Sequence, residues 1–283
     1  MKKLLIVEFK RVFFNWKFYA VILLGSAMAI LAFFNTPGWT IAQTWVSYMN
    51  GDANAAMIIE KINMVDTPLE IWMPRYGSSS KFYATWLTIL PILTVIPFGV
   101  EYMKEKKTGL INQFRVRVKT SQYYLSKFIV TFVSGGTVAV IPLIVNLLLV
   151  MCFLAWGNPI KTSGLYPVVD GNVLEKIFYE QPALYIFLYL FYFFCLFGLI
   201  SAVVLTFTYL EENVFALMVT PFILYFAEHV FFTFGLNHTN SSLLNNANLY
   251  NVFTDNISIL IVQILILILI DACFFICIRK DVL

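Results

Sequence analysis

The polar residues that could do chemistry in this sequence stand singly or in pairs inside long apolar stretches. Glu228 and His229 are adjacent, whereas Asn146 and Asp271 each lie alone. A charged or strongly polar side chain within a membrane span is costly unless it is paired or faces water, so each of these residues is a candidate for a specific role. For Glu228 and His229, a polar feature of a translocation route and a structural contact are equally favoured.

The two isolated residues favour different roles. Asn146 is more typical of a hydrogen bond between helices than of a ligand contact, and Asp271 is expected to pair with a basic residue near the amino terminus. The candidates for a substrate pathway are therefore Asn146, Glu228 and His229.

Known catalytic patterns are missing from the sequence. It holds no G-x-x-x-x-G-K-[ST] phosphate-binding loop and no H-E-x-x-H zinc motif. Glu211 and Glu212 are paired as in intramembrane proteases of the CAAX type, but position 216 is Ala and the chain has 2 histidines, too few for the two further histidine motifs of those enzymes. We expect neither an enzyme nor a metal site.

The 4 cysteines fall inside the apolar stretches, which argues against a disulfide framework. Cys273 and Cys277 lie four residues apart, on one face of a helix, and no histidine or carboxylate stands beside them with ligand spacing. Packing is the favoured role for these side chains over a metal or redox pair.

Composition identifies the class of protein. The chain has 283 residues, of which 60% are hydrophobic and 12% charged, whereas a soluble domain carries about 25% charged residues. We therefore predict an all-α integral membrane protein that forms a single transmembrane domain over residues 1–283. An amphipathic helix over residues 1–17 is expected to lie in the membrane interface, because aromatic and aliphatic residues alternate there with Lys and Arg.

Apolar runs long enough to cross a bilayer predict six transmembrane helices. The predicted spans are residues 18–34, 82–100, 128–156, 182–208, 214–234 and 257–278. The connections on one side are the outer loops 35–81, 157–181 and 235–256, of which the first is expected to hold one or two short helices. Prolines at 91 and 97 predict a kink in the second span.

Lys and Arg are distributed unequally between the two sides. The amino-terminal segment has five, the segment 101–127 seven and the carboxyl-terminal tail two, against three and two in the first two outer loops. The positive-inside rule therefore places both termini and the segment 101–127 in the cytosol, and we expect a multi-pass protein of the cell membrane, of bacterial origin.

The segment 101–127 is the strongly basic polar connection, and it lies between the second and third spans. A short helix at Tyr102 to Phe114 would present Leu110, Ile111 and Phe114 to a separate soluble protein, while the basic residues face lipid phosphates or an acidic partner. A plain topogenic loop explains the charge but leaves this ordered apolar set unexplained.

The layout resembles the permease subunit of type-2 ABC exporters, the ABC-2 family, over essentially the whole chain. That family has a cytosolic interfacial helix, six spans and a basic connection between spans 2 and 3. Its loose motif is similar to Glu101, Glu105, Gly109, Leu110 to Phe114, Thr120–Ser121 and Lys127. The Pro that usually precedes the turn is replaced by Val118–Lys119, so the end of the helix is not defined by the motif.

The resemblance implies a cytosolic coupling helix that docks into a groove of a separate ATPase. The residues assigned to ATPase coupling are Glu101, Glu105, Gly109, Leu110, Ile111 and Phe114. The implied partners are two copies of the ATPase and a second permease copy or paralogue within the lipid bilayer, without nucleic acid. ATP and Mg would be bound by the ATPase, and this chain would hold no cofactor.

The expected function is export of an amphipathic or hydrophobic substrate, such as a peptide, a drug or a lipid-linked molecule. The spans offer few charges to replace the hydration of a strongly charged solute, and the outward direction is implied by the resemblance. The alternative is a membrane protein not driven by ATP: a secondary transporter or channel, or an immunity or scaffold protein. A secondary transporter typically has internal repeats and more charge within the membrane.

Overall fold

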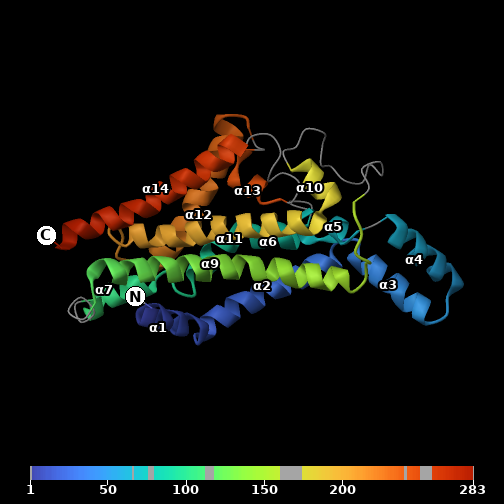
Figure 1. Ribbon diagram of the computed structural model, residues 1–283, viewed down its shortest axis with the longest axis horizontal. Helices are drawn as coiled ribbons and strands as arrows, with labels where there is room; N and C mark the ends of the chain where they lie inside the picture. The colour runs from blue at the N-terminus through green and yellow to red at the C-terminus, as the bar shows by residue number, and fades with distance from the viewer. Residues whose placement is uncertain are drawn as a thin grey trace.

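The computed structural model describes residues 2–65, 67–75, 80–111, 118–159, 174–238, 241–248 and 257–282. Every regular element within these residues is a helix, which confirms the predicted all-α class. The helices form an elongated bundle in which the two chain ends lie at the same end as α7 (Glu101–Lys107), here called the α7 end (Figure 1). The opposite end carries α4 (Ala53–Val65) and is called the α4 end.

Within the described residues, four helices are long and apolar enough to cross a membrane. They are α2 (Trp16–Phe34), α9 (Thr120–Met151), α11 (Pro182–Phe207) and α12 (Val214–Val230), the last continued by the π-helical η4 (Phe231–Gly235). At a rise of about 1.5 Å per residue, such lengths match the hydrocarbon core of a bilayer. The structure therefore agrees with a membrane protein.

Two shorter apolar helices complete the bundle. The first is α6 (Lys81–Val95), which contains Pro91 and ends two residues before Pro97. The second is the stretch Leu260–Phe274 of α14 (Ile257–Val282). They correspond to the second and sixth predicted spans, and the full set of six crossings stays a prediction.

The helices α9 and α11 pack against each other more extensively than the other helix pairs of the described residues, and glycines face the partner helix. A Cβ atom added to Gly136 would stand 2.7 Å from the backbone oxygen of Phe194, and one added to Gly198 would stand 2.8 Å from the backbone oxygen of Phe132. No larger residue fits at either position without moving a backbone. Gly135 and Gly136 therefore allow a close approach of the two helices.

At the α7 end, the amino-terminal helix is shorter than predicted. It is α1 (Lys2–Phe13), and Asn15 follows shortly after it as the N-cap of the next helix. The Asn15 side chain accepts a hydrogen bond from the backbone N–H of Lys17 at 3.1 Å and so caps α2. The first long helix therefore begins at Trp16.

The predicted continuous helix from Tyr102 to Phe114 is wrong, because it is interrupted at Thr108 and Gly109 before Leu110 and Ile111, which are again helical. α7 ends at Lys107, Thr108 follows as its C-cap, and Gly109 adopts the left-handed conformation with φ 71°. A left-handed residue just after a helix end is a common terminator, and glycine adopts it without a steric penalty. Phe114 lies outside the described residues.

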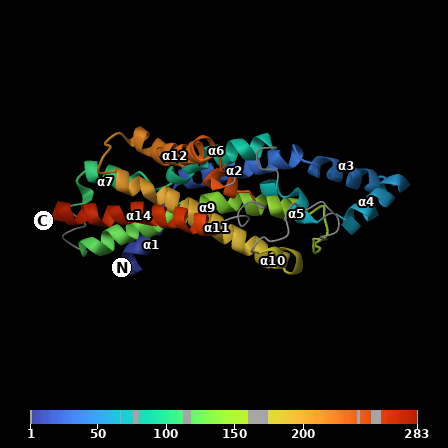
Figure 2. The same ribbon diagram turned by 90° about the horizontal axis from the view of Figure 1, so that it is seen from above.

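At the α4 end, α3 (Gly38–Met49) and α4 form a helical hairpin that extends beyond the bundle (Figures 1 and 2). This agrees with the expected short helices in the first outer loop. Three further short elements lie beside the bundle, namely α5 (Pro68–Ile71), η1 (Met73–Arg75) and α10 (Glu175–Glu180). Trp72 fixes this part to the bundle, because its indole N–H donates to the backbone oxygen of Leu143 at 2.9 Å.

Candidate functional site

Glu105 is the centre of a buried cluster of charges at the α7 end. Its Oε1 atom accepts hydrogen bonds from Arg11 Nη1 and from Lys127 Nζ, each at 2.7 Å, and its Oε2 atom accepts from the Tyr123 hydroxyl. These contacts join three helices, because Arg11 lies on α1, Glu105 on α7, and Tyr123 and Lys127 on α9.

A second carboxylate completes this ionic cluster. Glu8 Oε2 lies 3.0 Å from Lys127 Nζ, and Glu8 Oε1 lies 3.4 Å from Arg11 Nη1. Glu8 and Lys127 are both 0% exposed, and Glu105 is 5% exposed. We define the ionic cluster as Glu8, Arg11, Glu105, Tyr123 and Lys127. Its two acids and two bases leave it without net charge, which makes its burial tolerable.

The remaining electrostatics of this region follow from the same burial. Burial alone would lower the pKa of Arg11, but the carboxylates of Glu8 and Glu105 outweigh it and raise that pKa above its usual value. The pKa of Tyr102 is also raised, by burial and by its hydrogen bond to Tyr209. Both side chains therefore keep their usual protonation state at any physiological pH.

Some of the predicted coupling residues are buried in the structure, and others are exposed. Glu105 is inside the ionic cluster rather than on a docking surface, and Ile111 is 6% exposed, which contradicts its expected presentation to a partner. Glu101 pairs with Lys104 in the same helix at 2.7 Å, on the surface. Leu110 is 36% exposed. A groove of about 370 Å³ lies beside the cluster and is lined by residues that include Arg11, Glu101 and Leu110.

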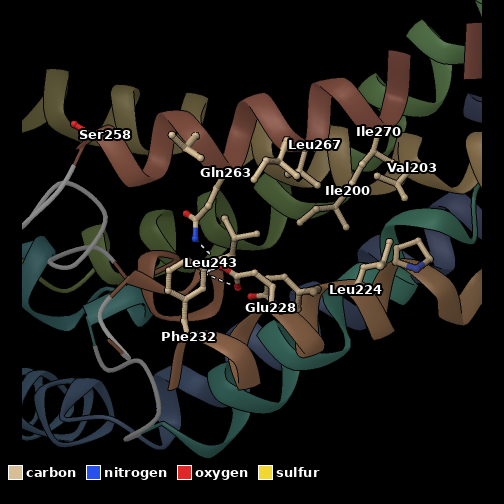
Figure 3. Close-up of a pocket in the computed structure, with 14 residues that line it drawn as sticks. Ile200, Val203, Leu224, Glu228, Phe232, Leu243, Ser258, Gln263, Leu267 and Ile270 are labelled. Carbon is tan, nitrogen blue, oxygen red and sulfur yellow. Dashed lines mark hydrogen bonds between the residues drawn. The ribbon is translucent and has the colours of Figure 1, made fainter. Parts of the chain in front are cut away.

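A cavity of about 460 Å³ lies between α11, α12 and α14 (Figure 3). Most of its lining is aliphatic or aromatic. The lining residues that carry polar groups are Tyr225, Glu228, Ser258 and Gln263. The candidate Glu228 therefore faces a cavity, whereas sequence reasoning left its surroundings open.

Glu228 is held by neutral donors. The backbone N–H of Leu243 donates to both carboxylate oxygens, at 3.3 and 3.1 Å, and Gln263 Nε2 donates to Oε1 at 2.5 Å (Figure 3). Gln263 Nε2 also donates to the backbone oxygen of Ser241 at 2.7 Å. Two acceptors on one side of the amide define its orientation, so the Gln263 nitrogen and oxygen are assigned without ambiguity.

His229 and Asn146 have structural contacts. His229 Nδ1 lies 2.9 Å from the Ser242 hydroxyl, next to the short helix α13 (Leu243–Asn246). Asn146 is fully buried; its amide donates to the backbone oxygen of Ala29 at 2.7 Å and accepts from the N–H of Met73 at 2.9 Å. The interhelical role of Asn146 is therefore the one that the structure has.

Asp271 differs from the expectation. Its side chain is 3% exposed, and within the described residues neither carboxylate oxygen has a hydrogen-bond partner or an ion pair. Within the described residues, no basic side chain of the amino-terminal helix pairs with Asp271, and Arg11 contacts Glu8 and Glu105.

Sequence reasoning missed four of the residues that define these sites: Glu8, Arg11, Tyr123 and Gln263. Glu8 and Arg11 stand three residues apart on a short helix, a spacing that predicts their mutual contact but not the third helix. Gln263 is a polar residue in an apolar run, and that signal could have found it. In the part of the chain that the structure describes, no three His, Cys, Asp or Glu side chains gather as metal ligands.

Comparisons with protein-family models, with characterised proteins and with solved structures gave no match for this chain.

Proposed function

We propose that this chain is the membrane subunit of an ATP-driven exporter of the ABC-2 type, with six spans and both termini in the cytosol of a cell-membrane protein. A second permease copy and two copies of a separate ATPase would complete the transporter. The ATPase would bind ATP and Mg, and the substrate would be amphipathic or hydrophobic.

One observation carries the proposal: α7 is joined to α9 by a buried ion pair and to α1 by the partly exposed Arg11. A short helix at the end of a bundle transmits force only if it cannot move independently of the helices behind it. Here Glu105 contacts α1 through Arg11 and α9 through Lys127, both at 2.7 Å. A push on α7 would therefore reach α1 and the 32-residue α9 together.

The surface that a partner could contact is the exposed side of α7 and the turn after it. Lys106, Lys107 and Leu110 lie on that surface, next to the groove beside the ionic cluster. An acidic rim on the ATPase would complement the lysines, and an apolar contact would cover Leu110. This arrangement retains the docking role for Leu110 and gives Glu105 the role of fastening the docking helix.

The test is co-purification of the chain with the ATPases encoded beside it, in detergent and again in lipid nanodiscs. We expect one ATPase to accompany the permease and its hydrolysis rate to change on binding. Leu110→Asp should weaken this association at least tenfold. Leu236→Asp is the matched control, because Leu236 is also exposed, at 47%, but lies after η4, away from α7.

The proposal fails if no ATPase associates with the chain. It also fails if substrate export persists when the phosphate-binding loop of the ATPase has been inactivated. Either result would favour a membrane protein not driven by ATP. If Leu110→Asp and Leu236→Asp weakened ATPase association equally, Leu110 would not be part of a docking surface.

A further inference from the structure

We propose that the cavity between α11, α12 and α14 binds an organic cation that carries one positive charge and a bulky apolar body, with the charge placed at Glu228. This inference rests on the proposed transport function, because it names the class of amphipathic molecule that the transporter would take. It assigns Glu228 and Gln263 as binding residues.

The shape and lining of the cavity fit the apolar body. Its volume of about 460 Å³ lies in the range of sites for drug-sized molecules, roughly 300–1,000 Å³. Its walls are formed by aliphatic side chains of all three helices, among them Ile200, Leu224 and Leu267 (Figure 3). Such walls give no compensation for a second charge, so they favour a molecule whose polar part is confined to one end.

The charge at one end of the cavity fits the cationic group. Glu228 accepts hydrogen bonds only from the neutral donors Leu243 N–H and Gln263 Nε2, and it has no ion pair within the described residues. Its Oε2 atom accepts only the Leu243 N–H, at 3.1 Å, so it keeps room for another donor. A carboxylate in an apolar cavity is stabilised most by an opposite charge.

Two further oxygen atoms add acceptor capacity here. The buried Oε1 atom of Gln263 and the buried hydroxyl oxygen of Tyr225 have no hydrogen-bond partner within the described residues. An excess of acceptors beside a carboxylate favours a ligand that donates, such as an ammonium. It disfavours an anion, which Glu228 would repel.

The cavity also has a route of entry from the side of the bundle. Leu224 on α12 and both Val262 and Ile266 on α14 line it and are 37%, 52% and 49% exposed. This opening lies between two helices whose outer faces are apolar, so it would face lipid. An amphipathic cation that has partitioned into the membrane could enter without crossing water.

The experiment measures binding of radiolabelled 1-pyrenemethylammonium to the full chain in nanodiscs, without any ATPase. It carries a donating ammonium at one end of a bulky apolar ring system, and 1-pyrenecarboxylate, with the same ring system and the opposite charge, is the matched ligand control. We expect saturable binding of the ammonium, at least tenfold tighter than that of the carboxylate. Glu228→Gln should weaken ammonium binding at least tenfold, whereas Glu60→Gln, on the exposed α4, should leave it unchanged.

Equal binding of the two ions, or ammonium binding that Glu228→Gln does not change, would overturn the proposal and indicate a cavity filled by lipid chains. If Glu228→Gln fails to fold, Leu224→Trp replaces it, because the larger ring obstructs the cavity at its opening and leaves the carboxylate in place. Loss of binding in Leu224→Trp supports the site, and unchanged binding overturns it. Because no ATPase is present, failure here is distinct from failure of ATPase association.

Discussion

The Glu105 carboxylate on α7 and the Lys127 ammonium on α9 form a hydrogen-bonded ion pair of 2.7 Å that is closed to solvent. Two charges removed from water lose hydration that their mutual attraction only partly replaces, so such a pair depends on complete partners. Here Arg11, Glu8 and the Tyr123 hydroxyl supply them. Substitutions of Glu105 and Lys127 therefore test how firmly α7 is attached to the bundle.

Replacing Lys127 with Met should destabilise the protein by about 3–5 kcal/mol, because two buried carboxylates would then share Arg11 alone. The measurement is the free energy of unfolding in mixed micelles. Lys104→Met is the control, since its pair with Glu101 is on the surface and should contribute only about 0–1 kcal/mol. Similar losses in the two variants would show that the ionic cluster is not buried.

The double variant Glu105→Gln with Lys127→Met should lose less stability than the two single variants added together. Removing both partners leaves Glu8 and Arg11 as a complementary pair, so fewer charges are left unbalanced. We expect a coupling energy of about 1–3 kcal/mol from the double-mutant cycle. Simple additivity would mean that the two residues do not interact.

Gly109→Ala should destabilise the protein by about 1–2 kcal/mol, because its φ of 71° is strained for a residue with a Cβ atom. This reverses the expectation from a continuous helix, in which alanine would be favourable. Gly109→Asn should cost less, since asparagine tolerates the left-handed conformation. No heavy atom stands within 4 Å of an added Cβ, so the loss reports the backbone alone. An alanine variant at least as stable as the native chain would contradict the left-handed conformation and support a helix that continues through Gly109.

Gly198→Ala should separate α9 from α11 and cost about 1–3 kcal/mol, because the new methyl group would meet the backbone of Phe132 at 2.8 Å. Gly157→Ala is the control, as the nearest atom there is Thr67 Cγ2 at 3.7 Å. Thermal unfolding midpoints of the two variants, followed in the same detergent, provide the comparison. An unchanged midpoint for Gly198→Ala would contradict the close approach.

Hydropathy predicted helix ends best where an apolar run is bounded closely by polar residues or proline. The fourth span was predicted at 182–208 and observed at Pro182–Phe207, because a proline and a polar link bound it. The third was predicted to begin at 128 but begins at Thr120. Its first two turns are polar in composition, yet Tyr123 and Lys127 are buried by α1 and α7, which hydropathy does not detect.

The sites were predicted less completely, for a related reason. Glu105 stands in a basic segment, where a charge is expected to face water, and only the arrival of α1 and α9 from distant parts of the sequence buries it. Glu228 was singled out because a carboxylate in an apolar run is unusual. Its partner Gln263 lies 35 residues away, and nothing local relates the two. Single sequences show which residues are unusual, whereas tertiary packing decides what they contact.

We propose that α7 transmits the action of an ATPase through the ionic cluster. The most direct measurement is the ATP hydrolysis rate of the partner ATPase, alone and in complex with native, Glu60→Gln or Glu105→Gln permease, at a temperature where all three are folded. We predict that Glu105→Gln still binds the ATPase but no longer changes its rate, while Glu60→Gln, on the exposed α4 at the other end of the bundle, behaves like the native chain. A Glu105→Gln permease that changes the rate as much as the native one would contradict the claim.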